Sequence, residues 1–133
     1  MAEADEAVVL RFAQAMVDPD VAAIAGSLAD DVVIHVPGRN PLSGEHRGKG
    51  LVLRRLFQAW EEAFGSLQIE IHDILSTDEH VVLLSDRRAE RDGTEVRMRA
   101  ASIYHVGSGR ITEAWLMEWD PYILDEFLRP ERP

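Results

Sequence analysis

Hydrophobic residues recur at helical spacing along the first half of the chain. Residues 5–17 place four apolar side chains on one face of a predicted helix: Val8, Phe12, Ala15 and Met16. A second, shorter helix is expected after Asp18-Pro19, because aspartate is a good N-cap and proline is favoured in the first turn. A longer helix is expected from Gly48 to Gly65, and its apolar face holds Leu53, Leu56, Phe57, Trp60 and Phe64.

The second half of the chain changes to the alternating pattern of strands. Strands are predicted over residues 67–75, 80–90, 94–106 and 111–119, after an earlier one over the β-branched run 32–36. Asp92-Gly93 is a strong hairpin signal between two of them. Asp120-Pro121 then repeats the aspartate–proline start of a helix, which is predicted over residues 122–128.

This order of elements predicts an α+β fold. Helices grouped before a meander of antiparallel strands indicate α+β rather than a parallel α/β fold. We expect one domain over residues 1–133, built as a strongly curved, mostly antiparallel sheet wrapped around the long helix. A chain of this length buries roughly two thirds of its unfolded surface and needs no metal or disulfide to hold it together.

Composition narrows the function classes. The net charge of -10 disfavours nucleic acid and anionic membranes as partners. The basic residues Arg87, Arg88, Arg91, Arg97 and Arg99 are interleaved with acids and are interpreted as a solvated sheet face. The absence of cysteine and of an apolar segment near 20 residues long predicts a cytoplasmic protein outside the membrane. No histidine pair has ligand spacing with a carboxylate, so no metal site is predicted.

Two stretches carry a family resemblance. One is Leu28-Ala29-Asp30-Asp31-Val32-Val33-Ile34-His35-Val36-Pro37-Gly38, followed by Pro41-Leu42-Ser43-Gly44-Glu45-His46-Arg47-Gly48, and the other is Gly109-Arg110-Ile111-Thr112-Glu113-Ala114-Trp115 through Asp120. Both closely resemble the SnoaL-like branch of the nuclear-transport-factor-2-like superfamily. The resemblance implies a conical pocket for a small hydrophobic molecule, helped by Trp60, Phe64 and Tyr104, and a homodimer through the convex sheet face. It does not imply a particular reaction, because this fold hosts isomerases, cyclases, hydrolases, dehydratases and binding proteins.

Ketosteroid isomerases of this superfamily give a residue-level comparison. Their oxyanion-holding tyrosine falls on Phe12, their aspartate base on Val36, and their protonated aspartic acid near Ser102. Phe12 and Val36 cannot transfer a proton or donate a side-chain hydrogen bond, which excludes that constellation. Ile34 is two residues before Val36 and therefore faces the same side of the strand. Phe12, Ile34, Val36 and Ser102 are expected to line a cone that is more apolar than that of the isomerases.

Two other reactions of the superfamily remain open. Limonene-type epoxide hydrolases use an Asp-Arg-Asp unit, and the available Asp86, Arg88 and Asp120 match neither its order nor its spacing. SnoaL-like polyketide cyclases use an acid late in the chain, for which Glu118 and Asp120 are available. An apolar cone would raise the pKa of such a carboxyl and make it an acid or base near neutral pH.

Each catalytic candidate also has a structural interpretation. Asp120 precedes a proline and is explained as an N-cap, while Glu118 can lie in water at the sheet rim. His35 alternates with Ile34 and Val36, so it faces away from the cone unless a bulge precedes Pro37.

The leading hypothesis is a cofactor-free cyclase or isomerase of a hydrophobic, carbonyl-bearing substrate. Its chemistry would rest on Glu118 or Asp120, assisted by His35 or Tyr104. The alternatives are a non-catalytic binding or stabilising module and, third, an epoxide-hydrolase-like enzyme. A homodimer is expected from the apolar face formed by Ile111, Trp115, Met117 and Trp119.

Overall fold

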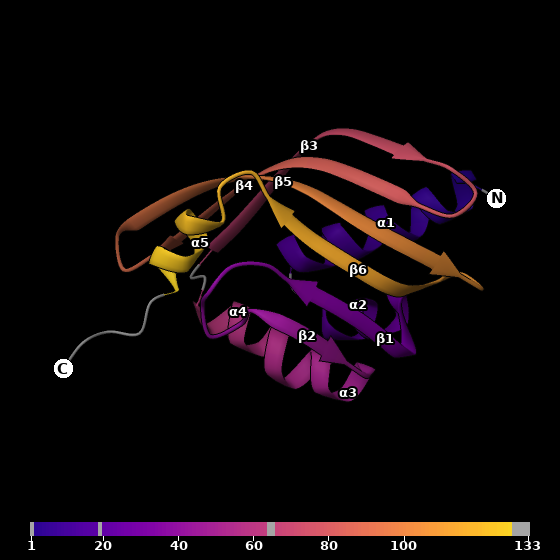
Figure 1. Ribbon diagram of the computed structural model, residues 1–133, viewed down its shortest axis with the longest axis horizontal. Coiled ribbons are helices and arrows are strands. Elements are labelled where there is room, and N and C mark those ends of the chain that lie inside the picture. Colours follow the sequence, from indigo (N-terminus) through magenta and orange to yellow (C-terminus); the bar gives the residue numbers. More distant parts are fainter. Residues whose placement is uncertain (1, 19, 64–65, 129–133) are drawn as a thin grey trace.

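A strongly curved sheet dominates the structure, a computed structural model that describes residues 2–18, 20–63 and 66–128 (Figure 1). Within these residues the sheet has six strands in the order β2-β1-β6-β5-β4-β3. Their bounds are β1 Leu28–Val36, β2 Gly44–Arg47, β3 Ser66–Ser76, β4 Val81–Arg91, β5 Thr94–Gly107 and β6 Arg110–Glu118. β1 and β6 are parallel and the other neighbours antiparallel, which confirms the predicted α+β fold with a mostly antiparallel sheet.

The helices begin and end close to the predicted positions. They are α1 Ala2–Val17, α2 Val21–Ser27, α3 Lys49–Leu51, the π-helical stretch η1 Val52–Phe57, α4 Gln58–Ala63 and α5 Pro121–Phe127. α3, η1 and α4 follow one another without a break and correspond to the predicted long helix. None of the helices in the described ranges is long and apolar enough to span a membrane.

α1 and η1 pack on the concave face of the sheet. Phe12 of α1 meets Phe57 of η1 and Tyr104 of β5 edge to face, with ring centroids 5.6 and 6.1 Å apart. The same side of α1 buries Val8 and Val9. The core therefore lies between these helices and the inner side of the sheet, and burial of this apolar surface is the main stabilising contribution to the fold.

Two details near the start of the sheet differ from the predictions. The N-cap of α2 is Asp20, whose side chain accepts a hydrogen bond from the backbone N–H of Ala23 at 3.1 Å, and not the predicted Asp18. Pro19 lies outside the described residues. The predicted loop over residues 37–48 contains the short strand β2, which pairs with the end of β1.

A bulge in β6 changes which side chains share a face. The register with β5 passes from His105↔Glu113 to Val106↔Ile111, so β6 carries one extra residue at Thr112. As a result Ile111 is fully buried, while Met117 is 46% exposed. The prediction that Ile111 shares the outer apolar face with Trp115 and Met117 is wrong, because simple alternation does not continue through the bulge.

α5 is fastened to the loop after β1. The side chain of Asp125 accepts hydrogen bonds from the backbone N–H of Arg39 at 2.9 Å and from Nδ2 of Asn40 at 2.8 Å. Gly38 has a φ of +93°, and a Cβ added there would collide with Oδ1 of Asp125. Glycine is therefore required at this position, both for its backbone conformation and for the close approach of α5.

Candidate functional site

The inner side of the sheet carries a buried polar cluster within an otherwise apolar core. Along β4, burial alternates so that Leu83, Ser85, Arg87 and Ala89 all face inward. Ser102 of β5 and Glu118 at the end of β6 face the same side. The side chains of Arg87 and Glu118 are 10% and 3% exposed, so both ionisable groups are held away from water on the inner side of the sheet.

Arg87 connects the three strands. Its Nη2 donates a hydrogen bond to Oγ of Ser102 at 3.0 Å, and its Nη1 lies 3.6 Å from Oε1 of Glu118. The registers Ser85↔Ala100 and Ala100↔Glu118 place the small side chain of Ala100 between the neighbouring strands. Because Ala100 has only a methyl group, it leaves room for the guanidinium to reach across β5.

Burial sets the electrostatics of this cluster. Desolvation raises the pKa of the Glu118 carboxyl above its ordinary value of 4.5, and the nearby positive charge of Arg87 opposes part of that rise. Desolvation also raises the pKa of Tyr104, against smaller lowering effects of Arg87 and of a hydrogen bond with Ser102. Tyr104 therefore keeps its proton at neutral pH, and burial favours the protonated form of Glu118 more than it would for an exposed carboxyl.

Aromatic rings form the wall opposite the strands. Phe57 contacts Phe12 and Trp60 edge to face, both at 5.6 Å between centroids. The predicted lining residues that the structure describes are all buried: Phe12, Ile34, Val36, Trp60, Ser102 and Tyr104. Phe64 lies outside the described residues. Contact of these residues with a ligand remains a prediction.

The other two catalytic candidates do not join Glu118. Asp120 is the N-cap of α5, and its side chain accepts a hydrogen bond from the backbone N–H of Tyr122 at 3.0 Å. His35 lies on the outer face, because Ile34 and Val36 are buried and alternation is kept up to Pro37. There its Nε2 is 2.6 Å from Oε2 of Glu113 and its ring stacks on Trp115.

The interpretation of the arginine-rich stretch as a solvated sheet face is wrong for Arg87. The run Arg87-Arg88 looked like a pair of surface charges, but alternation turns Arg87 inward and leaves Arg88 exposed. Sequence reasoning also missed Ser85 as a site residue. The strand alternation could have indicated both residues. Ser85 and Arg87 occupy every second position together with the apolar Val81, Leu83 and Ala89, so all five side chains are expected on the same face.

The residues considered for an epoxide hydrolase unit are not brought together. Asp86 and Arg88 face outward from β4, and Asp120 caps α5. Asp86 instead pairs with Nε2 of His72 at 2.9 Å and with Nε of Arg99 at 3.5 Å. The hydrogen bond with His72 is the main cause that lowers the pKa of Asp86.

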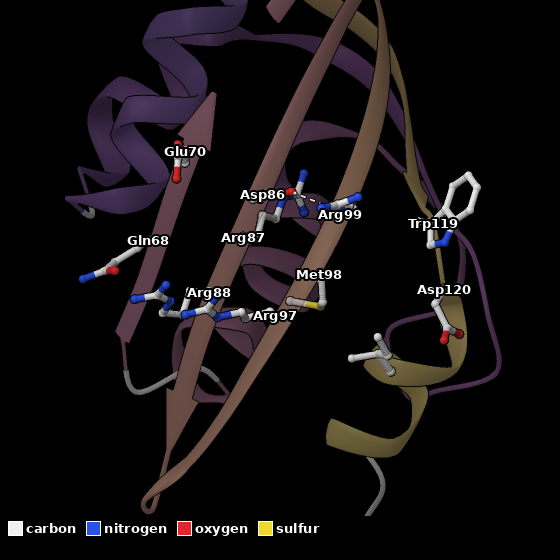
Figure 2. Close-up of a pocket in the computed structure, with 11 residues that line it drawn as sticks. Gln68, Glu70, Asp86, Arg87, Arg88, Arg97, Met98, Arg99, Trp119 and Asp120 are labelled. Carbon is white, nitrogen blue, oxygen red and sulfur yellow. Dashed lines mark ion pairs between the residues drawn. The ribbon is translucent and has the colours of Figure 1, made fainter. Parts of the chain in front are cut away.

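A polar hollow of about 500 Å³ lies where these outward residues approach α5 (Figure 2). Figure 2 shows the Asp86–Arg99 ion pair in it, with Arg88 and Arg97 farther along the same strands. Arg88 and Arg97 each lie 3.4 Å from the carboxylate of Glu95. Because its best-placed acid, Asp86, has a lowered pKa, this hollow is less suited to proton transfer than the inner cluster.

Within the described part of the chain, no three histidine, aspartate or glutamate side chains gather in a way that could hold a metal ion. The chemistry that the inner cluster can perform with its own side chains is proton transfer by Glu118 beside a fixed positive charge.

Comparisons with known proteins agree with this fold. The family model described as a SnoaL-like domain matches residues 9–114. Uncharacterized protein Rv0034 of Mycobacterium tuberculosis is 32% identical over 126 residues, which cover 94% of this chain and 96% of that protein. Bal32a, from a soil-derived mobile gene cassette, superposes with a TM-score of 0.89 at 23% identity and covers 96% of this chain and 98% of its own. TerC co-crystallized with polyporic acid superposes with a TM-score of 0.83 at 17% identity. The superposition covers 96% of this chain and 99% of TerC.

Proposed function

Because this chain belongs to the SnoaL-like domain family, we propose that it binds a small hydrophobic compound inside its cone and performs acid–base chemistry on a carbonyl group there. The observation that carries the proposal is the buried Glu118 beside Arg87, on the inner side of the sheet. The co-crystallization of TerC with polyporic acid supports small-molecule binding by a chain of similar fold.

Glu118 is the proposed acid–base residue. As a carboxylate it removes a proton from the carbon next to the carbonyl, and it returns that proton at a second position of the substrate. The positive charge of Arg87 stabilises the negative charge that develops on the carbonyl oxygen. Such a proton transfer gives isomerisation directly, or prepares a carbon nucleophile for ring closure, and it needs no cofactor.

Tyr104 is the proposed assisting group in place of His35. Its raised pKa keeps the hydroxyl protonated, so it can hold a hydrogen bond to Ser102 or to a ligand oxygen. His35 is separated from the cone by the sheet itself, since it pairs with Glu113 on the outer face. This arrangement favours a site formed from β4, β5 and β6 alone.

A non-catalytic binding module is the second candidate, favoured by the apolar side chains at Phe12 and Val36. Both are buried and supply no proton-transfer group where the isomerases of the superfamily have one. An epoxide hydrolase is less well supported. That reaction uses two acids around one arginine, and among the described residues only Glu118 lies within ion-pair distance of Arg87.

Exchange of carbon-bound hydrogen for deuterium tests the proposal without knowledge of the final product. Aryl ketones and aryl β-keto esters are incubated with the protein in deuterated buffer, and NMR follows the hydrogens next to the carbonyl. We expect exchange with the native protein and a loss of about a hundredfold or more in Glu118→Gln, the usual size of a general-base contribution.

Glu113→Gln is the matched control, because Glu113 lies on the same strand but on the outer face. It should leave the exchange rate within about a factor of two, since it removes a carboxylate far from the cone. Equal exchange in Glu118→Gln and the native protein would contradict the proposed role of Glu118. Binding of these compounds without any exchange would instead favour the binding module.

A further inference from the structure

Three buried polar atoms of the inner cluster have no hydrogen-bond partner among the described residues. They are Oγ of Ser85, Nε of Arg87 and Oε2 of Glu118. Ser85 is 2% exposed and the Glu118 side chain 3% exposed. Buried polar groups in native proteins are almost always hydrogen-bonded, so three such atoms in one place indicate that something else completes them.

The register places these atoms around one point of the sheet. Ser85 and Glu118 stand in the same row on either side of Ala100, two strand spacings or about 10 Å apart at their Cα atoms. The Arg87 side chain extends from the adjacent row toward Ser102 and Glu118. The small side chain of Ala100, between Ser85 and Glu118 in this row, adds no polar group of its own.

The free atoms offer complementary hydrogen-bonding roles. Nε of Arg87 and the hydroxyl of Ser85 can donate to a ligand oxygen, while Oε2 of Glu118 can accept from a ligand hydroxyl. Arg87 and the Glu118 carboxylate together carry no net charge. An anionic ligand would therefore bring an uncompensated charge beside Glu118, away from water, which is strongly unfavourable.

We propose that Ser85 and Nε of Arg87 bind an uncharged carbonyl oxygen while Oε2 of Glu118 accepts a hydroxyl of the same compound, so that the cone selects neutral hydroxy-carbonyl compounds over the corresponding carboxylates. Ser85 is then a specificity-determining residue. This inference rests on the proposed binding of a ligand in the cone and deepens it, but it does not depend on catalysis by Glu118.

Calorimetric binding of three naphthalene probes to the native protein tests the inference. 6-Acetyl-2-naphthol carries both polar groups, 6-hydroxy-2-naphthoate replaces the ketone by a carboxylate, and 2-isopropylnaphthalene has neither group. We expect the acetyl-naphthol to bind about tenfold or more tightly than the naphthoate. Naphthoate binding that equals or exceeds acetyl-naphthol binding would overturn the inference.

Ser85→Ala should weaken acetyl-naphthol binding about tenfold and leave isopropylnaphthalene unchanged, because only the ketone uses the hydroxyl. A purely structural effect of the substitution would weaken both probes alike. Ser85→Cys has nearly the same volume and a poorer hydrogen-bonding group, and it should give an intermediate loss. It also serves as the test variant if Ser85→Ala does not fold.

Unchanged acetyl-naphthol binding in both Ser85 variants would overturn the inference, and water alone would then satisfy Ser85. Failure of every probe to bind would overturn it together with the proposed pocket. Ser85-dependent binding without deuterium exchange of any carbonyl compound would sustain this inference while the proposed catalysis fails. The two outcomes are thus distinguishable.

Discussion

At the scale of single residues, the account depends on Arg87 and Glu118. The positive charge of Arg87 opposes the effect of burial on the pKa of the Glu118 carboxyl. Since Arg87 lowers the pKa of Glu118, it extends the carboxylate form, the form that acts as a base, to lower pH. Its position thus links the packing of β4 against β5 to the working pH of the proposed base.

Arg87→Met should shift the acidic limb of the deuterium-exchange profile to higher pH. Without the guanidinium, desolvation acts on Glu118 unopposed, so its pKa rises and a higher pH is needed to form the carboxylate. The pH dependence of the exchange rate measures this shift. Arg88→Met is the control, because Arg88 is exposed on the outer face of the same strand, and it should leave the limb in place. A limb that stays unmoved in Arg87→Met would contradict the role given to Arg87.

Sequence reasoning proposed Glu118 as an acid but did not find Arg87 beside it. Glu118 was recognisable as an acid near the end of the last strand, where related cyclases place theirs. Arg87 was not, because two consecutive arginines are typical of a solvated strand. Only the pairing of β4 with β5 and β6 shows that Ser102 and Glu118 lie within reach of Arg87. That pairing depends on contacts between residues far apart in sequence, which a local pattern does not contain.

At the scale of elements, the contact between α5 and the loop after β1 closes one end of the fold. α5 buries Leu124 and Phe127, and Asp125 fixes the helix to Arg39 and Asn40. Arg91 of β4 adds a hydrogen bond to the carbonyl of Phe127 at 2.8 Å. α5 is therefore held to two parts of the sheet that are distant in sequence.

Gly38→Ala should lower the free energy of unfolding by about 1–3 kcal/mol, the usual cost of forcing a side chain into such a backbone conformation. The added methyl group would also collide with Asp125. Gly26→Ala is the matched control, because Gly26 lies in α2 and an added Cβ meets nothing within 4 Å. It should be neutral or stabilise by up to about 1 kcal/mol. Urea unfolding measures both, and equal stabilities would contradict the tight contact at Gly38.

Most elements were predictable because hydrophobic periodicity and turn residues are local. The Asp92-Gly93 hairpin and the Asp120-Pro121 helix start both lie where the sequence indicated. The strand β2 was not predicted, since four residues of mixed polarity carry no clear alternation and gain their conformation by pairing with β1. The bulge at Thr112 was missed for a similar reason, because it is a property of the β5–β6 register.

At the scale of the whole molecule, the outer face of the sheet carries exposed apolar side chains. Met117 is 46% and Trp119 87% exposed, and Trp115 lies beside them half-buried. Exposed apolar patches of this kind often mark interaction sites. We expect the protein to form a homodimer through this face, which leaves the cones of both copies independent of the interface.

Light scattering on the native protein should give the mass of a dimer at micromolar concentration. Met117→Lys should shift the distribution toward monomer, because a buried lysine would disfavour the interface. Val21→Lys is the control, since Val21 is 63% exposed on α2, away from the sheet face, and the variant should remain dimeric. A monomeric native protein would contradict this expectation and leave the cone site unaffected.

The central claim is that Glu118 is an acid–base group held inside the cone by burial and moderated by Arg87. Carbon-detected NMR of protein labelled at its glutamate carboxyls tests it directly, with Glu118→Gln used to assign the resonance. The account predicts that Glu118 titrates above its ordinary value of 4.5. A midpoint at or below that value would show that desolvation does not dominate at Glu118, and it would contradict the claim.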